Sequence, residues 1–69
     1  MKFSARNQIK GMVKAINTGA VNSEVMIEMT AGVEIVSIIT NSSVQTLGLE
    51  VGKEAYAIIK ASNVMIAVE

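Results

Sequence analysis

The sequence lacks the residue types on which most catalytic and metal sites depend. Its 69 residues include no histidine, no cysteine and no aspartate. The absence of cysteine excludes disulfides, and the joint absence of cysteine and histidine makes a structural zinc site implausible. No nucleophile–base pair and no paired carboxylates can be identified, so an enzyme is the least expected class of protein.

Aromatic side chains and long apolar runs are also scarce. Phe3 and Tyr56 are the only aromatic residues. Proteins that bind single-stranded nucleic acids stack bases on aromatic side chains, so this scarcity and the near-neutral pI of 6.2 both weigh against that function. No apolar run is long enough to span a membrane and no signal-peptide pattern occurs, so we expect a cytoplasmic protein without a membrane partner.

The chain is short but rich in apolar residues. A domain of this length buries only about 60% of the surface of its unfolded chain, so a single copy is marginally stable. Small domains compensate with disulfides, a metal or oligomerisation, and the first two are disfavoured here. Because 51% of the residues are hydrophobic, we expect self-association.

Charge is balanced overall but unevenly distributed. Residues 1–23 hold four basic and no acidic side chains, a charge of +4; residues 24–69 hold two lysines and six glutamates, and 2 − 6 = −4. One explanation is charge balance between strands or subunits. The other is a local positive field near the N-terminus that attracts anions.

Apolar residues recur with a period of two, which indicates β-strands. The expected strands cover residues 8–17, 23–29, 34–40, 54–60 and 64–68. A helix competes for the first segment because its basic residues are spaced by four, but Gly11 and Val13 disfavour it. The strand over 34–40 is apolar on both faces, with Ile35 and Ile39 opposite Val36 and Ile38, so it needs cover on both faces.

Residues 41–47 form the one expected helix. Thr40 or Asn41 can act as its N-cap, and Gly48 stands where a left-handed residue ends many helices. Three strands, a short helix and two strands are the element order of a five-stranded, OB-like Greek-key barrel. A small β-sandwich and an SH3-like barrel are the alternatives. We expect residues 1–69 to form a single domain.

Several short segments are rich in hydrogen-bond donors. The first is residues 4–7, in which Ser4 and Ala5 precede Arg6; the second is residues 40–43, which begin with Thr40 and end with Ser43. Arginine, lysine, hydroxyls and free backbone N–H groups are the partners that an oxyanion needs, and the start of a helix favours an anion. For Thr40 and Ser43, simple helix capping is the competing explanation.

Two further segments follow the same pattern. Near the end of the chain stand Lys60, Ala61 and Ser62, and an early turn comprises Gly19, Ala20, Val21 and Asn22. Small residues in such a turn can expose backbone N–H groups as an anion-binding nest. Each segment also has an ordinary explanation as a solvated charge or a loop. If the segments converge, a pocket with donors and few acceptors suits a fully deprotonated tetrahedral dianion such as molybdate, tungstate or sulfate better than protonated phosphate.

Taken together, the segments SARNQIKGMV, GAVNSEVMIEM, ITNSSVQTLGL and VGKEAYAIIKASNVMIAV resemble the molbindin family, small molybdate-binding proteins built from a single Mop domain. The similarity runs over residues 4–68. It implies an OB-like barrel, a homo-hexamer arranged as a trimer of dimers, and storage or homeostasis of molybdate or tungstate.

The resemblance also implies two kinds of oxyanion site between subunits. In the first, one subunit supplies Ser4, Ala5, Arg6, Lys60, Ala61 and Ser62, and a neighbour supplies Thr40 and Ser43. The second, near the three-fold axes, involves Gly19, Ala20, Val21 and Asn22. An OB-type module for single-stranded nucleic acid is the alternative function, and a purely structural oligomerisation module is a third.

Overall fold

The computed structural model describes residues 1–69. Four strands, one α-helix and one 3-10 turn follow each other along the chain: β1 (Asn7–Thr18), β2 (Asn22–Thr30), β3 (Val33–Thr40), α1 (Asn41–Leu47), β4 (Glu54–Ile59) and η1 (Ala61–Asn63). The first three strands, the helix and the fourth strand therefore lie where the sequence predicted them. The model contains no helix long and apolar enough to cross a membrane.

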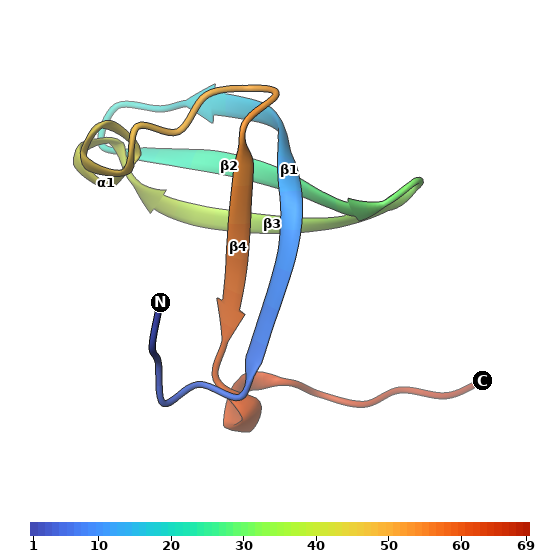
Figure 1. Cartoon of the computed structure of the whole chain (residues 1–69). Helices are drawn as coiled ribbons and strands as arrows, with labels where there is room; N and C mark the ends of the chain where they lie inside the picture. Colours follow the sequence, from blue (N-terminus) through green and yellow to red (C-terminus); the bar gives the residue numbers. More distant parts are fainter.

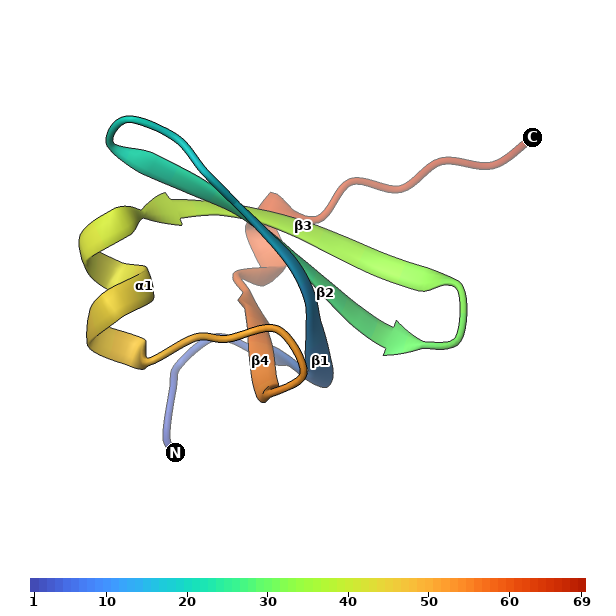
Figure 2. The ribbon, with the colours of Figure 1, turned by 90° about the horizontal axis from the view of Figure 1, so that it is seen from above.

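The strands form one antiparallel sheet in the order β3-β2-β1-β4, and the sheet curls so that α1 lies beside its open side (Figures 1 and 2). The long strand β1 serves two partners: residues Asn7 to Met12 pair with β4, and Met12 to Thr18 pair with β2. The register shifts between Val13 and Ala15, which is where β1 bends from one partner to the other. This arrangement is the predicted OB-like fold.

The core at the centre of the sheet is small. Val13, Val25 and Ile27 are its buried cluster, and Ile16 and Ile39 pack against it. The register shift turns Ile16 toward this core, although strict alternation along β1 would place Ile16 on the opposite face from Val13. Such a small core provides little hydrophobic stabilisation, as the length of the chain predicts.

The helix has the boundaries and caps that its sequence predicts. Thr40 is the N-cap, and its side chain accepts a hydrogen bond from the Ser43 N–H. Gly48 has φ 63° and ψ 36°, the left-handed conformation that a glycine tolerates best. No residue of α1 is fully buried, so its caps and the packing of Val44 beside the core hold it in place.

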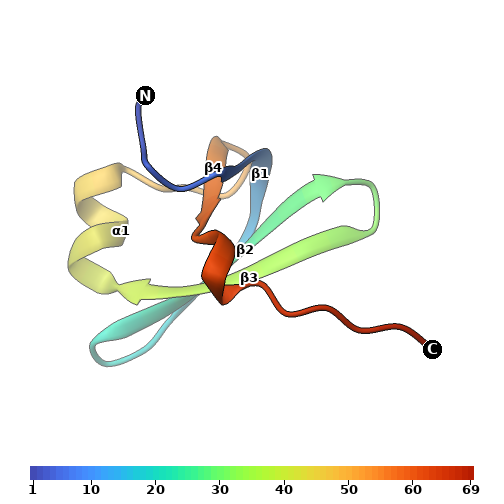
Figure 3. The same cartoon turned by 90° about the horizontal axis from the view of Figure 1, so that it is seen from below.

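The predicted fifth strand over residues 64–68 is wrong for this chain. After η1, this segment runs away from the sheet without pairing (Figures 1 and 3). Met65, Ile66 and Val68 are 92%, 86% and 91% exposed. Alternating apolar residues suit a strand, but a strand also needs a neighbouring edge for its hydrogen bonds, and this segment pairs with none in its own chain.

Candidate functional site

The pairing of β1 with β4 brings the two ends of the chain together. Asn7 is the first residue of this ladder and lies opposite Ile59, the last residue of β4. The residues just outside the ladder therefore face each other and line an open hollow with a volume of about 480 Å³: Ser4, Ala5, Arg6, Lys60, Ala61 and Ser62. These are the six residues that the sequence proposed for one half of the first oxyanion site.

Local hydrogen bonds hold both walls of this hollow. The Gln8 side-chain amide donates to the Ala5 carbonyl at 3.1 Å. On the other wall, the Asn63 N–H donates to the Lys60 carbonyl at 2.9 Å and closes the turn of η1. The backbone on each side is thus shaped before any ligand is present.

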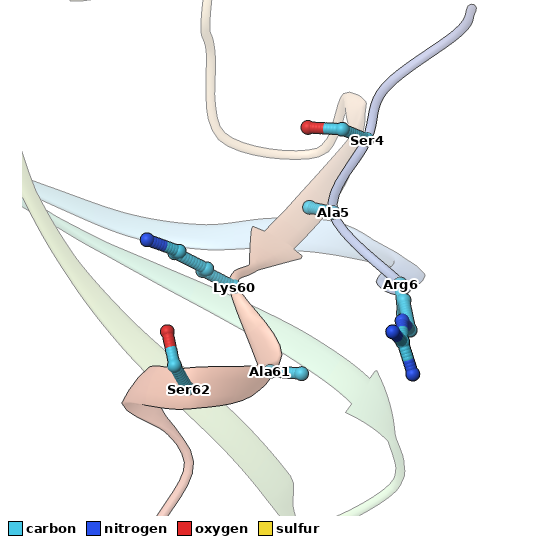
Figure 4. Close-up of a pocket in the computed structure, with 6 residues that line it drawn as sticks. All are labelled: Ser4, Ala5, Arg6, Lys60, Ala61 and Ser62. Atoms are coloured by element: carbon cyan, nitrogen blue, oxygen red, sulfur yellow. The ribbon is translucent and has the colours of Figure 1, made fainter.

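The side chains of the hollow are donors and cations. Figure 4 shows the Ser4 hydroxyl, the Lys60 ammonium and the Ser62 hydroxyl directed to one side, while the Arg6 guanidinium points away from them. No carboxylate lines the hollow. An anion entering it would meet donors and positive charge and no competing acid.

Two of the other basic residues near the start of the chain, Lys10 and Lys14, are paired with acids on other strands. Lys14 lies 2.6 Å from Glu34 and 3.5 Å from Glu28. The hydrogen bond and charge of Glu34, with help from Glu28, raise the pKa of Lys14 above its usual 10.5. Lys10 lies 3.5 Å from Glu54. Charge balance between strands therefore explains Lys10 and Lys14.

Arg6 and Lys60 differ from those lysines, because neither takes part in any of the ion pairs of the chain. Their charges are thus available to a ligand. Of the basic residues near the N-terminus, Lys2 also takes part in no ion pair, and Arg6 is the one that lines this hollow.

Thr40 and Ser43 do not reach the hollow. They lie where β3 meets α1, at the opposite end of the molecule from η1 (Figure 1). The predicted cap is confirmed: the Ser43 N–H donates to Thr40 Oγ1 at 3.0 Å. Thr40 Oγ1 in turn donates to Ser43 Oγ at 2.8 Å, which leaves the Ser43 hydroxyl proton free for another acceptor.

The turn of residues 19–22 joins β1 to β2 and also lies far from Arg6 and Lys60. The Gly19 N–H donates to the Asn22 carbonyl at 2.8 Å, which tightens the turn. Asn22 is paired with Thr40 across the β2–β3 ladder. One chain therefore places two of the predicted segments side by side, and the other two together at the far end.

Sequence reasoning missed the hydrogen bond between Ser23 and Asn41 beside the turn, since it considered Asn41 as a helix N-cap and as part of a donor-rich segment, and did not consider Ser23. Ser23 is only 1% exposed, and its hydroxyl donates to Asn41 Oδ1 at 2.5 Å. Asn41 Nδ2 donates to the Gly19 carbonyl at 2.9 Å. The available signal was Ser23 itself, a polar residue in line with Val25 and Ile27 on the inward face of a strand.

Comparison with known proteins places this chain in a family. The model of the TOBE domain matches residues 4–66. A protein of Haemophilus influenzae described as a probable molybdenum-pterin-binding protein is 54% identical over the full length of both chains. The chain belongs to the molbindin family. MopII from Clostridium pasteurianum, of known structure, is 43% identical over 97% of this molbindin-family chain and all of its own, with a TM-score of 0.90.

A third relative has been solved with its ligand. It is the cytoplasmic molybdate-binding protein ModG with molybdate bound, which is 51% identical and has a TM-score of 0.89. The alignment covers 94% of this molbindin-family chain and 46% of the ModG chain. MopII and the matched part of ModG share the fold described above. The names of the Haemophilus influenzae protein and of ModG both state a binding function.

Proposed function

We propose that this protein binds molybdate or tungstate reversibly, for storage and homeostasis of the oxyanion in the cytoplasm. Binding uses hydrogen bonds and positive charge, and no bond is made or broken, so the protein is not an enzyme. Residues 1–69 act as a single Mop domain. Neither a nucleic acid nor a membrane is a partner.

The observation that carries this proposal is the hollow at the paired chain ends. Lys60 supplies uncompensated charge there, and Ser4 and Ser62 supply hydroxyls. Arg6 also lines the hollow and takes part in no ion pair, and its guanidinium would turn inward to reach the ligand. Such a site suits a tetrahedral dianion that carries no proton, since a protonated ligand would need an acceptor. The bound molybdate of ModG, which is 51% identical, supports this choice of ligand.

The same hollow is incomplete within one chain. Its volume of about 480 Å³ is far larger than a five-atom oxyanion, and it is open to solvent. Thr40 and Ser43, at the opposite end of the fold, can complete it only from another subunit. We therefore propose shared sites in a homo-hexamer, a trimer of dimers, in which Ser43 donates its hydroxyl proton and Thr40 orients it. The turn of Gly19, Ala20, Val21 and Asn22 forms the second kind of site near the three-fold axes.

Exposed apolar surface supports self-association independently of the ligand. Val36 and Ile38, on the outer face of β3, are 56% and 70% exposed. A mainly apolar groove of about 470 Å³ opens beside β3 and β4, with Phe3 and Tyr56 in its lining. Together with the unpaired tail, this is more apolar surface than a monomer of this size readily leaves in water.

Native mass spectrometry with and without sodium molybdate tests both parts of the proposal. We expect an assembly of six chains that takes up molybdate, with sulfate as a weaker competitor. Calorimetry on the same sample gives the affinity. A monomer that binds molybdate fully would contradict the shared sites. An assembly that binds neither molybdate nor tungstate would support the purely structural oligomerisation module.

A further inference from the structure

The side chain of Asn41 forms the centre of a hydrogen-bonded link between two parts of the chain. Its Nδ2 donates to the Gly19 carbonyl at 2.9 Å, and its Oδ1 accepts from the Ser23 hydroxyl at 2.5 Å. The orientation of the amide is determined by chemistry: a carbonyl can only accept, so the NH₂ group must face Gly19 and the oxygen must face Ser23.

The backbone of Asn41 contributes a third bond to the same turn. Its N–H donates to the Val21 carbonyl at 2.8 Å. Asn41, the first residue of α1, is thus hydrogen-bonded to Gly19 and Val21 of the β1–β2 turn and to Ser23 of β2. Figures 1 and 2 show this turn close to the start of the helix.

The link is protected from solvent on one side. Ser23 is the only polar residue in the buried interior of the chain. Asn41 Oδ1 is the acceptor for its hydroxyl, so removing either partner leaves a buried polar atom unpaired. Water can replace the part-buried bond from Ser23 only with difficulty, whereas the bond from Asn41 Nδ2 to Gly19 is exposed. The Ser23 bond therefore contributes most to defining the spacing between the turn and the helix start.

We propose that Asn41 is a positioning residue for oxyanion binding. This inference rests on the proposed function above. Asn41 sets the turn of residues 19–22 against Thr40 and Ser43, so that the two candidate oxyanion segments move as one unit. Loosening the link misplaces donors in both segments at once.

The test uses the full chain, sodium molybdate and two variants that leave every proposed ligand residue in place. Ser23→Ala removes the donor to Asn41 and adds no charge. Asn41→Asp removes the donor to Gly19 but keeps the acceptor for Ser23, and it provides the test if Ser23→Ala does not fold. Gln45→Glu, an exposed residue one turn along α1, makes the same amide-to-carboxylate change without touching the link.

We expect Ser23→Ala to weaken molybdate binding about 5- to 10-fold by calorimetry, the effect of about one lost hydrogen bond. Amide hydrogen exchange should become faster in the peptide that contains residues 19–22 and in the first turn of α1. Asn41→Asp should weaken binding clearly more than Gln45→Glu does.

Three results separate the explanations. If Ser23→Ala or Asn41→Asp has a lower melting temperature but binds molybdate with the wild-type affinity, Asn41 has only a structural role and the inference is wrong. If Asn41→Asp and Gln45→Glu weaken molybdate binding equally, the loss of affinity is due to the added negative charge. That result would also contradict the inference. If the wild-type chain itself binds no molybdate, the failure lies with the proposed function.

Discussion

Asn7 and Ile59 lie opposite each other at the end of the β1–β4 ladder. This one pair decides that Arg6 and Lys60, 54 positions apart in the sequence (60 − 6 = 54), line the same hollow. Backbone pairing thus brings the donor residues of the two chain ends together. The short turn η1 then directs the chain after β4. A site built this way depends on the register of the sheet, and it forms only when β1 and β4 have paired.

Replacement of the free cations should weaken the binding of molybdate strongly. We expect Arg6→Ala and Lys60→Ala each to raise the dissociation constant about 10- to 100-fold, since a hydrogen bond to a charged group contributes about 1.5–3 kcal/mol. Lys14→Ala is the control, because the ammonium of Lys14 is already paired with Glu34 at 2.6 Å. Calorimetric titration measures all three variants. Similar affinities for Arg6→Ala and Lys14→Ala would contradict the proposed site.

Thr40 allows helix capping to be separated from oxyanion binding. Aspartate is as good an N-cap as threonine or better, so Thr40→Asp should keep the melting temperature within a few degrees of the wild type. Its carboxylate would repel a dianion, so molybdate binding should fall about 10-fold or more. Thr40→Asn, a neutral cap, is the matched control and should bind better than Thr40→Asp. If aspartate is tolerated without loss of affinity, Thr40 lies outside the site.

The ion pair of Lys14 makes a pH-dependent contribution to stability. Its pKa is raised in the folded chain, so the contribution is fully present below the unfolded value of 10.5 and is lost as pH rises through the higher folded value. Melting temperatures measured from neutral pH to above 10.5 should show the wild type keeping its advantage over Glu34→Gln up to about 10.5 and losing it above that pH. An unchanged difference between the two proteins at every pH would show that the pair does not contribute in this way.

Gly11 is required where β1 passes closest to β2. A Cβ atom at this position would lie 2.6 Å from the Glu28 carbonyl oxygen and 2.7 Å from Ile27 Cγ2. Gly11→Ala should therefore destabilise the fold by about 1–3 kcal/mol, the usual cost of overpacking. Lys10→Ala, one residue earlier and exposed, removes only a surface ion pair and should cost much less. Urea denaturation of both variants measures the free energy of unfolding. If Gly11→Ala is as stable as Lys10→Ala, the close contact at Gly11 does not restrict the residue at this position.

The candidate site was predictable in its parts but not in its arrangement. Donor type and charge make Arg6 and Lys60 candidates from sequence alone, the family resemblance implies their place in a site, and the sequence predicts the cap at Thr40 and the turn of residues 19–22. Nothing in the sequence pattern indicates that Asn41 is bonded to Ser23. That contact joins residues 18 positions apart, and no local preference encodes it.

The sequence by itself determined the first four strands, the helix with its caps at Thr40 and Gly48, and the residue types that can hold an oxyanion, because alternation, capping and side-chain chemistry depend on neighbours a few positions away. Only the tertiary structure decided the register of β1 with β4, the separation of Thr40 from Arg6, and the unpaired course of residues 64–68. These features depend on which strand edges meet, and an apolar segment becomes a strand only where an edge is free to pair with it.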